Sequence, residues 1–106
     1  MVESSAVAFD PQEMEQHASQ AADLLKKMAN PSRLMILCSL SEGELSVGEL
    51  NESVTLSQSA LSQHLAALRK ADLVDTRREA QTIFYSLKGN HAMKVVAVLQ
   101  DIFCPS

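Results

Sequence analysis

Hydrophobic residues recur every three or four positions over residues 57–70, a spacing that predicts an amphipathic helix. Leu61, Leu65 and Leu68 fall on one side of this helix and must face a core. The other side carries short hydroxyl and amide side chains with small residues, and no acidic residue follows until Asp72. A face of this kind can approach base edges closely without repelling phosphates. The pattern therefore favours contact with nucleic acid.

Helix-start signals define two further helices before this one. Residues 10–13 combine an N-cap acid, a proline at the first helical position and a glutamate three residues after the cap, and they predict a helix to about Ala29. Asn30–Pro31 opens a second helix over residues 32–40. This second helix is apolar nearly all round and should be buried, with Gly43 at its exit. The apolar positions of the first helix are Met14, Ala18, Ala21, Ala22 and Leu25.

A helix-turn-helix is predicted next. Ser46 and Glu49 form a capping box that opens a short helix to about Ser53. Residues 54–56 form the turn, and Ser57 caps the amphipathic helix.

After Leu73 the hydrophobic period changes to two, as a strand requires. Residues 82–87 form one strand, residues 74–78 pair with it, and residues 79–81 lie at or near the hairpin tip. A last helix is expected over residues 91–103. The fold class is thus mainly α with a small β-hairpin wing (α+β): a winged helix-turn-helix in the order α-α-α-α-β-β-α.

The length of 106 residues suits one domain with a modest core. We expect a flexible tail over residues 1–9 and a single DNA-binding and dimerisation domain over residues 10–104. No apolar run is long enough to span a membrane and no cleavable leader is evident, so we expect a cytoplasmic protein. Glycine-rich phosphate loops and the helical His-Glu-x-x-His motif are absent, so we expect no enzyme activity, catalytic residue or cofactor.

The net charge of −4 argues weakly against DNA binding. The acidic residues, however, concentrate in the N-terminal stretch and in residues 42–52. A symmetric dimer would double the small basic patch of the reading region and direct the acidic parts elsewhere. The basic residues of that patch are Arg69, Lys70, Arg77 and Arg78, opposed by Asp72, Asp75 and Glu79.

The two cysteines allow two interpretations. Cytosolic thiols stay reduced, so a pair there suggests either switching chemistry or no special role. Taken alone, Cys38 in an apolar helix is most often a small buried hydrophobe. Cys104, near the terminus and followed by proline, would then be an exposed bystander.

Three stretches together resemble the ArsR/SmtB family of bacterial transcriptional regulators, and the resemblance covers the chain from about residue 12 to the end. They are residues 44–50 (ELSVGEL), 56–65 (LSQSALSQHL) and 77–85 (RREAQTIFY). Within that family the positions of Cys38 and Cys104 resemble the HlyU/BigR/SqrR/YgaV group, whose members use two cysteines to sense reactive sulfur or oxidants.

This resemblance implies a homodimer built on the first and last helices, with the recognition helices in successive major grooves of a two-half-site operator. It also implies that a Cys38–Cys104 disulfide or polysulfide, formed by reactive sulfur species or oxidants, switches DNA affinity. Whether binding represses or activates is left open. The residues assigned to DNA are Ser57, Gln58, Ser59, Ser62, Gln63, Arg69, Arg77, Arg78, Gln81 and Thr82.

Simpler interpretations compete with some of these assignments. Arg77 and Arg78 are either phosphate contacts, which we favour, or ordinary charges on a hairpin tip. His64 projects about 60° from the leucine stripe on a wheel of 3.6 residues per turn, so we interpret it as structural or backbone-positioning. Tyr85 belongs to the apolar set of its strand and is interpreted as core.

Two other functions are kept as alternatives. Metal-responsive relatives carry thiolate ligands where this chain has Ser46 and Gly48, and the last helix offers only His91 and Asp101, so no standard metal site is expected. Cysteines from two subunits could still form a non-standard zinc or copper(I) site. The second alternative is a winged-helix protein-interaction module without a DNA target, which the acidic net charge mildly favours.

Overall fold

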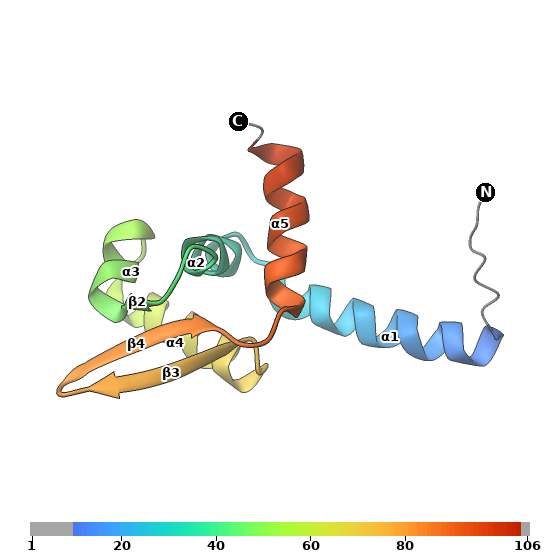
Figure 1. Ribbon diagram of the computed structural model, residues 1–106, viewed down its shortest axis with the longest axis horizontal. Coiled ribbons are helices and arrows are strands. Elements are labelled where there is room, and N and C mark those ends of the chain that lie inside the picture. Colours follow the sequence, from blue (N-terminus) through green and yellow to red (C-terminus); the bar gives the residue numbers. More distant parts are fainter. Residues whose placement is uncertain (1–9, 105–106) are drawn as a thin grey trace.

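The computed structural model describes residues 10–104, so the expected tail over residues 1–9 lies outside the described residues. Within these residues the chain forms five helices and a small antiparallel sheet, whose arrangement is drawn in Figure 1. The elements are α1 (Pro11–Met28), α2 (Pro31–Leu40), β2 (Leu45–Ser46), α3 (Val47–Ser53), α4 (Gln58–Lys70), β3 (Val74–Glu79), β4 (Thr82–Leu87) and α5 (His91–Phe103). The expected order of helices and hairpin is confirmed, with one strand added.

The added strand is β2, two residues long, which pairs antiparallel with β4. The sheet therefore has the strand order β2-β4-β3, with Leu45 opposite Tyr85 and Ser46 opposite Phe84. The sequence pattern predicted a two-stranded wing because a segment of two residues shows no alternation. Its extended conformation depends on pairing with a distant strand.

The leucine stripe of α4 is buried as predicted. Leu61, Leu65 and Leu68 are each at most 2% exposed and belong to the hydrophobic core cluster. In α2 the expectation of complete burial is too strong, because Met35 is 46% exposed and Cys38 is only partly buried. The remaining buried members of the cluster are Met28, Ile36, Leu37, Leu40, Leu50, Val54, Leu73, Val74, Ala92 and Val96.

Three of the predicted helix caps form their hydrogen bonds. The side chains of Asn30 and Ser57 accept from backbone N–H groups three residues on, and Ser46 forms the full capping box with Glu49. Asp10 occupies the N-cap position of α1, but its side chain makes no capping bond. Proline at the first position already removes one orphan N–H from that helix end.

His64 has the structural role predicted for it. Arg33, in α2, donates from Nε to Nδ1 of His64 in α4 over 3.3 Å. The same guanidinium donates from Nη1 to the backbone oxygen of Lys27 in α1 over 3.1 Å. One side chain thus joins the end of α1, the start of α2 and the middle of α4.

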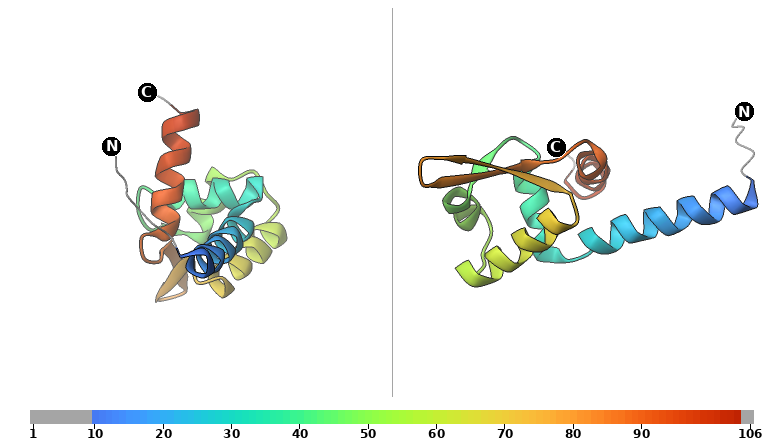
Figure 2. Two further views of the ribbon diagram at one scale, coloured as in Figure 1. Left: turned by 90° about the vertical axis from the view of Figure 1, so that its right-hand side faces the viewer. Right: turned by 90° about the horizontal axis from the view of Figure 1, so that it is seen from below.

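The helix α1 extends away from the body, and α5 stands against α2, as Figures 1 and 2 show. Apolar side chains on both helices are left uncovered within one chain. Met14 and Leu25 of α1 are 50% and 53% exposed, and Phe103 of α5 is 75% exposed. Single exposed apolar residues are normal, but here they gather along two helices.

The hairpin tip consists of Ala80 and Gln81, because β3 continues through Glu79, one residue further than predicted. Ala80 has φ = +57°, a left-handed conformation that costs an L-residue about 1–2 kcal/mol. Glycine adopts it without that cost but loses more backbone entropy on folding.

We predict that Ala80→Gly raises the free energy of unfolding by about 0.5–1 kcal/mol, the net of these two effects. Urea unfolding at a fixed protein concentration measures the change. Gln81→Gly is the matched control, because Gln81 is the other residue of the hairpin tip and does not have a positive φ. That substitution should lower stability, and a gain of equal size from both variants would rule out strain at Ala80.

Candidate nucleic-acid interface

The outward face of α4 is polar and free of carboxylates. Ser57 caps the helix by accepting from the Ala60 N–H, and its hydroxyl lies 3.4 Å from that of Ser59. The first turn carries no acidic residue, and Arg69 and Lys70 occupy the last turn. All ten residues that the sequence assigned to DNA are exposed. The face can therefore meet a polyanion along its whole length.

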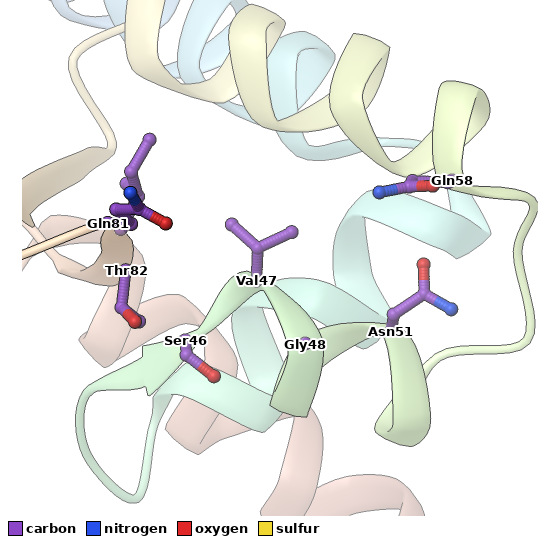
Figure 3. A pocket seen from close by; sticks show the side chains of 8 residues that line it. Ser46, Val47, Gly48, Asn51, Gln58, Gln81 and Thr82 are labelled. Carbon is purple, nitrogen blue, oxygen red and sulfur yellow. The ribbon is translucent and has the colours of Figure 1, made fainter.

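An open hollow of about 690 Å³ lies between the start of α4, the start of α3 and the wing. Figure 3 shows Gln58 and Asn51 on one side of this hollow, with Gln81 and Thr82 across from them and Val47 between. Three of the assigned residues, Gln58, Gln81 and Thr82, are thus brought together from segments more than twenty residues apart. Amide and hydroxyl groups that converge in this way can hydrogen-bond base edges or phosphate oxygens.

A second hollow of about 580 Å³ lies between α4 and the sheet. Ser62 and Arg69, both assigned to DNA, line it together with Lys70. Ile83 and Tyr85 form its apolar wall, and Tyr85 also packs against the core, as expected. The remaining assigned residues, Ser57, Ser59, Gln63, Arg77 and Arg78, line neither hollow.

The two wing arginines lie on opposite faces of the sheet. Arg78 is paired with Ile83, and cross-strand partners project to the same side, so Arg78 shares the face that lines the hollows. Arg77 is paired with Phe84 and projects to the other side. There Arg77 forms ion pairs with Glu44 and with Glu79, each at 2.7 Å.

These ion pairs change the charge of the wing. The hydrogen bonds from Arg77 hold the pKa of Glu44 below its usual range, and the two carboxylates raise the pKa of Arg77. Arg77 therefore stabilises the charged form of Glu44. Sequence reasoning missed Glu44, because no local pattern links it to a residue 33 positions away.

Sequence reasoning also missed Asn51, Val47 and Gly48, which line the first hollow. The available signal was Asn51, a polar residue on the first helix of the helix-turn-helix, six residues before Ser57, the N-cap of α4. Lys70 stood on the predicted polar face but was not assigned to DNA, although it lines the second hollow beside Arg69.

The two cysteines are free thiols on α2 and just after α5. Burial raises the pKa of the Cys38 thiol, and the nearby charge of Cys104 raises it further, while a hydrogen bond with Gln100 opposes both effects. Cys104 is exposed. Gln100 also donates from Nε2 to the hydroxyl of Ser41 over 3.3 Å, so the end of α5 is joined to the end of α2.

Metal ligands do not gather in the part of the chain that the structure describes. Across residues 10–104 no group of three or more His, Cys, Asp or Glu side chains is placed to hold a metal ion. Within the same residues, none of the helices combines the length and apolar character that crossing a membrane requires.

Comparison with known proteins agrees with this geometry. Residues 30–76 match the arsR family of bacterial regulatory proteins. The chain is 54% identical to the transcriptional activator HlyU of Vibrio cholerae, over 88% of this chain and 86% of that protein. It is 50% identical to the biofilm growth-associated repressor of Agrobacterium fabrum, over 86% of this chain and 78% of that one.

Solved structures of similar proteins share the fold. Reduced HlyU from Vibrio cholerae gives a TM-score of 0.83 at 54% identity, over 88% of this chain and 98% of that one. The repressor BigR from Xylella fastidiosa gives 0.83 at 43% identity, over 92% and 100%. These relatives are regulators and not enzymes. The chain belongs to the ArsR family of bacterial transcriptional regulators, which bind DNA through a winged helix-turn-helix.

Proposed function

We propose that this regulator is a cytoplasmic homodimer that reads a two-half-site operator, and that a bridge between Cys38 and Cys104 lowers its affinity for DNA. The outward face of α4, polar and without carboxylates between two open hollows, carries the first part of this proposal. The packing of α5 against α2, with Cys38 on α2 and Cys104 directly after α5, carries the second.

DNA recognition is assigned to α4 and the wing. The side chains of Ser62 and Gln63 project away from the leucine stripe, and Gln58 stands exposed at the first position of α4, beside the first hollow. All three have the hydrogen-bonding groups that discriminate bases in the major groove. Arg69 stands at the C-terminal end of the same helix, beside the second hollow, where it meets the phosphates that flank the groove. Gln81 and Thr82 bring the wing to the backbone on the other side of α4.

The dimer is assigned to α1 and α5. Their uncovered apolar residues include Met14, Leu25, Ile102 and Phe103, each at least half exposed in one chain. A self-complementary surface of this kind closes a two-fold dimer. The dimer then sets the separation of the two α4 helices, which must be about 34 Å to reach successive major grooves.

The thiol reaction begins at Cys104, because it is exposed, whereas burial keeps more of Cys38 in the unreactive thiol form. The Cys104 thiolate takes the outer sulfur of a low-molecular-weight persulfide and releases the corresponding thiol. The Cys38 thiolate then attacks Sγ of Cys104, expels hydrosulfide and leaves a disulfide. If Cys38 is itself a persulfide, its terminal sulfur makes the same attack and a trisulfide forms.

Peroxide reaches the same disulfide by another route. The Cys104 thiolate attacks one oxygen of hydrogen peroxide, the O–O bond breaks, and a sulfenic acid forms as hydroxide leaves. Attack by Cys38 on Sγ of this sulfenic acid then expels water and forms the disulfide. Plain disulfides require Cα atoms within about 7 Å, and inserted sulfurs relax that limit. A persulfide is therefore favoured over peroxide as the signal if the Cα atoms of Cys38 and Cys104 stay more than about 7 Å apart.

We predict that Ser62→Glu weakens DNA binding at least about tenfold, because it places a carboxylate against base edges and phosphates. Fluorescence anisotropy with a duplex selected from a random library by the wild-type protein measures the affinity. Ser53→Glu adds the same charge at the end of α3, beside Glu42 and Glu44 and away from the face of α4.

The control variant should stay within about twofold of the wild type at physiological salt, because screening weakens charges more than about 8 Å apart. Equal losses from both variants would show that net charge, not the face of α4, governs binding. A wild-type protein that selects no duplex would favour the protein-interaction alternative.

We predict that bridging Cys38 to Cys104 lowers operator affinity by about tenfold or more, within the usual range of allosteric coupling. Reduced protein is treated separately with glutathione persulfide, hydrogen peroxide and glutathione disulfide. Intact mass then distinguishes a disulfide, about 2 Da lighter than the dithiol, from a trisulfide, about 30 Da heavier. Cys38→Ser and Cys104→Ser cannot bridge and should keep binding DNA after each treatment.

Limited alkylation tests the order of the reaction, and peptide mapping should find Cys104 labelled before Cys38. Protein that is fully bridged but binds its operator as tightly as the reduced form contradicts the switch. Tight zinc or copper(I) binding that displaces DNA, and is lost in both serine variants, would establish the metal alternative instead.

A further inference from the structure

All three guanidinium nitrogens of Arg77 donate hydrogen bonds to carboxylates of the same chain. Nε donates to Oε2 of Glu44 over 2.9 Å and Nη2 to Oε1 of the same carboxylate over 2.7 Å, which is a bidentate pair. Nη1 donates to Oε2 of Glu79 over 2.7 Å. The guanidinium carbon lies 4.5 Å from the centre of the Phe84 ring. A side chain held at four points has little freedom to turn toward another anion.

These contacts cross the sheet. Because β4 lies between β3 and β2, Arg77 on β3 must pass over Phe84 on β4 to reach Glu44, the residue directly before β2. β2 continues without a break into α3, whose start lines the hollow beside α4. Arg77 therefore joins the far strand of the wing to the segment that begins the helix-turn-helix.

Charge argues against a phosphate contact at this position. One guanidinium and the two carboxylates of Glu44 and Glu79 sum to a charge of −1, so the cluster as a whole repels a phosphate. Arg78 differs from Arg77 both in the face of the sheet it occupies and in its partners. It shares the face of Ile83 that borders the hollows, and among residues 10–104 no ion pair or hydrogen bond engages its side chain.

We propose that Arg77 is a positioning residue that holds the wing against the start of α3 through Glu44, and that Arg78 is the wing arginine that neutralises a phosphate. This inference rests on the proposed DNA recognition. It keeps the expected phosphate contact for Arg78 and proposes a different role for Arg77. Neighbours in a strand project to opposite faces.

The salt dependence of binding separates the two roles, because only a phosphate contact releases a counterion. Arg78→Gln should reduce the slope of log affinity against log salt by about 2 per dimer, one phosphate for each subunit. Arg77→Gln should weaken binding roughly two- to fivefold, as loss of an exposed ion pair does, and leave the slope unchanged. The probe is the duplex selected by wild-type protein, titrated between about 50 and 200 mM salt.

Glu44→Gln gives the sharpest contrast, because it removes a negative charge near DNA. If Glu44 only masked a phosphate-binding arginine, its loss would tighten binding. As the partner that holds the wing, its loss should weaken binding as much as Arg77→Gln does. The double variant E44Q/R77Q should then bind no more weakly than either single variant, since both remove the same contact.

A measurement without DNA completes the test. Amide hydrogen exchange along β3 and β4 should be faster in Arg77→Gln and Glu44→Gln than in the wild type and unchanged in Arg78→Gln. Matching circular dichroism spectra show that each variant is folded. Tighter binding by Glu44→Gln together with a reduced salt slope in Arg77→Gln overturns the proposal, as does unchanged exchange in both variants. Failure of the wild type to select DNA contradicts the proposed function instead, since the exchange data need no DNA.

Discussion

The burial of Leu61, Leu65 and Leu68 fixes the rotation of α4, and the rest of the interface follows from that rotation. Each fully buried leucine stabilises the fold by roughly 1.5–3 kcal/mol, more than any single polar contact in the domain. Turning the helix by one position in the C-terminal direction would place Ser62, Ala66 and Arg69 in the core instead of the three leucines. The polar face is therefore held outward by apolar packing, and no hydrogen bond to the rest of the protein is needed to present it.

This chain has a net charge of −4, and it can bind a polyanion only where its carboxylates are absent or paired. The outward face of α4 has none. In the wing, where Glu44 and Glu79 stand close to the reading region, Arg77 binds both and leaves Arg78 as the positive group on the hollow side. Lys88 holds Asp72 in the same way at the base of the hairpin. Local pairing, more than total charge, decides what a phosphate would meet.

Patterns within a few residues predicted most of the fold. The period of the leucines, the capping box at Ser46 and the alternation in β4 each act over one or two turns, so the sequence displays them directly. The pairing of β2 and the reach of Arg77 to Glu44 are different, because both depend on which distant segments the core brings together. The raised pKa of Cys38 also depends on distant segments, because it arises from burial and from the charge of Cys104, 66 positions along the chain.

The element that carries Cys38 is also the one that holds the recognition helix. Arg33, at the start of α2, donates to His64 on α4 and to the last turn of α1. Near the other end of α2 lies Cys38, where α5 already contacts it through Gln100 and Ser41. The proposed Cys38–Cys104 bridge would join α5 to α2 covalently, and a rotation of α2 would reach α4 through the hydrogen bond between Arg33 and His64. The helix α2 thus contacts α1, α4 and α5 and carries Cys38, so the proposed coupling of the thiols to the face of α4 needs no separate signalling element.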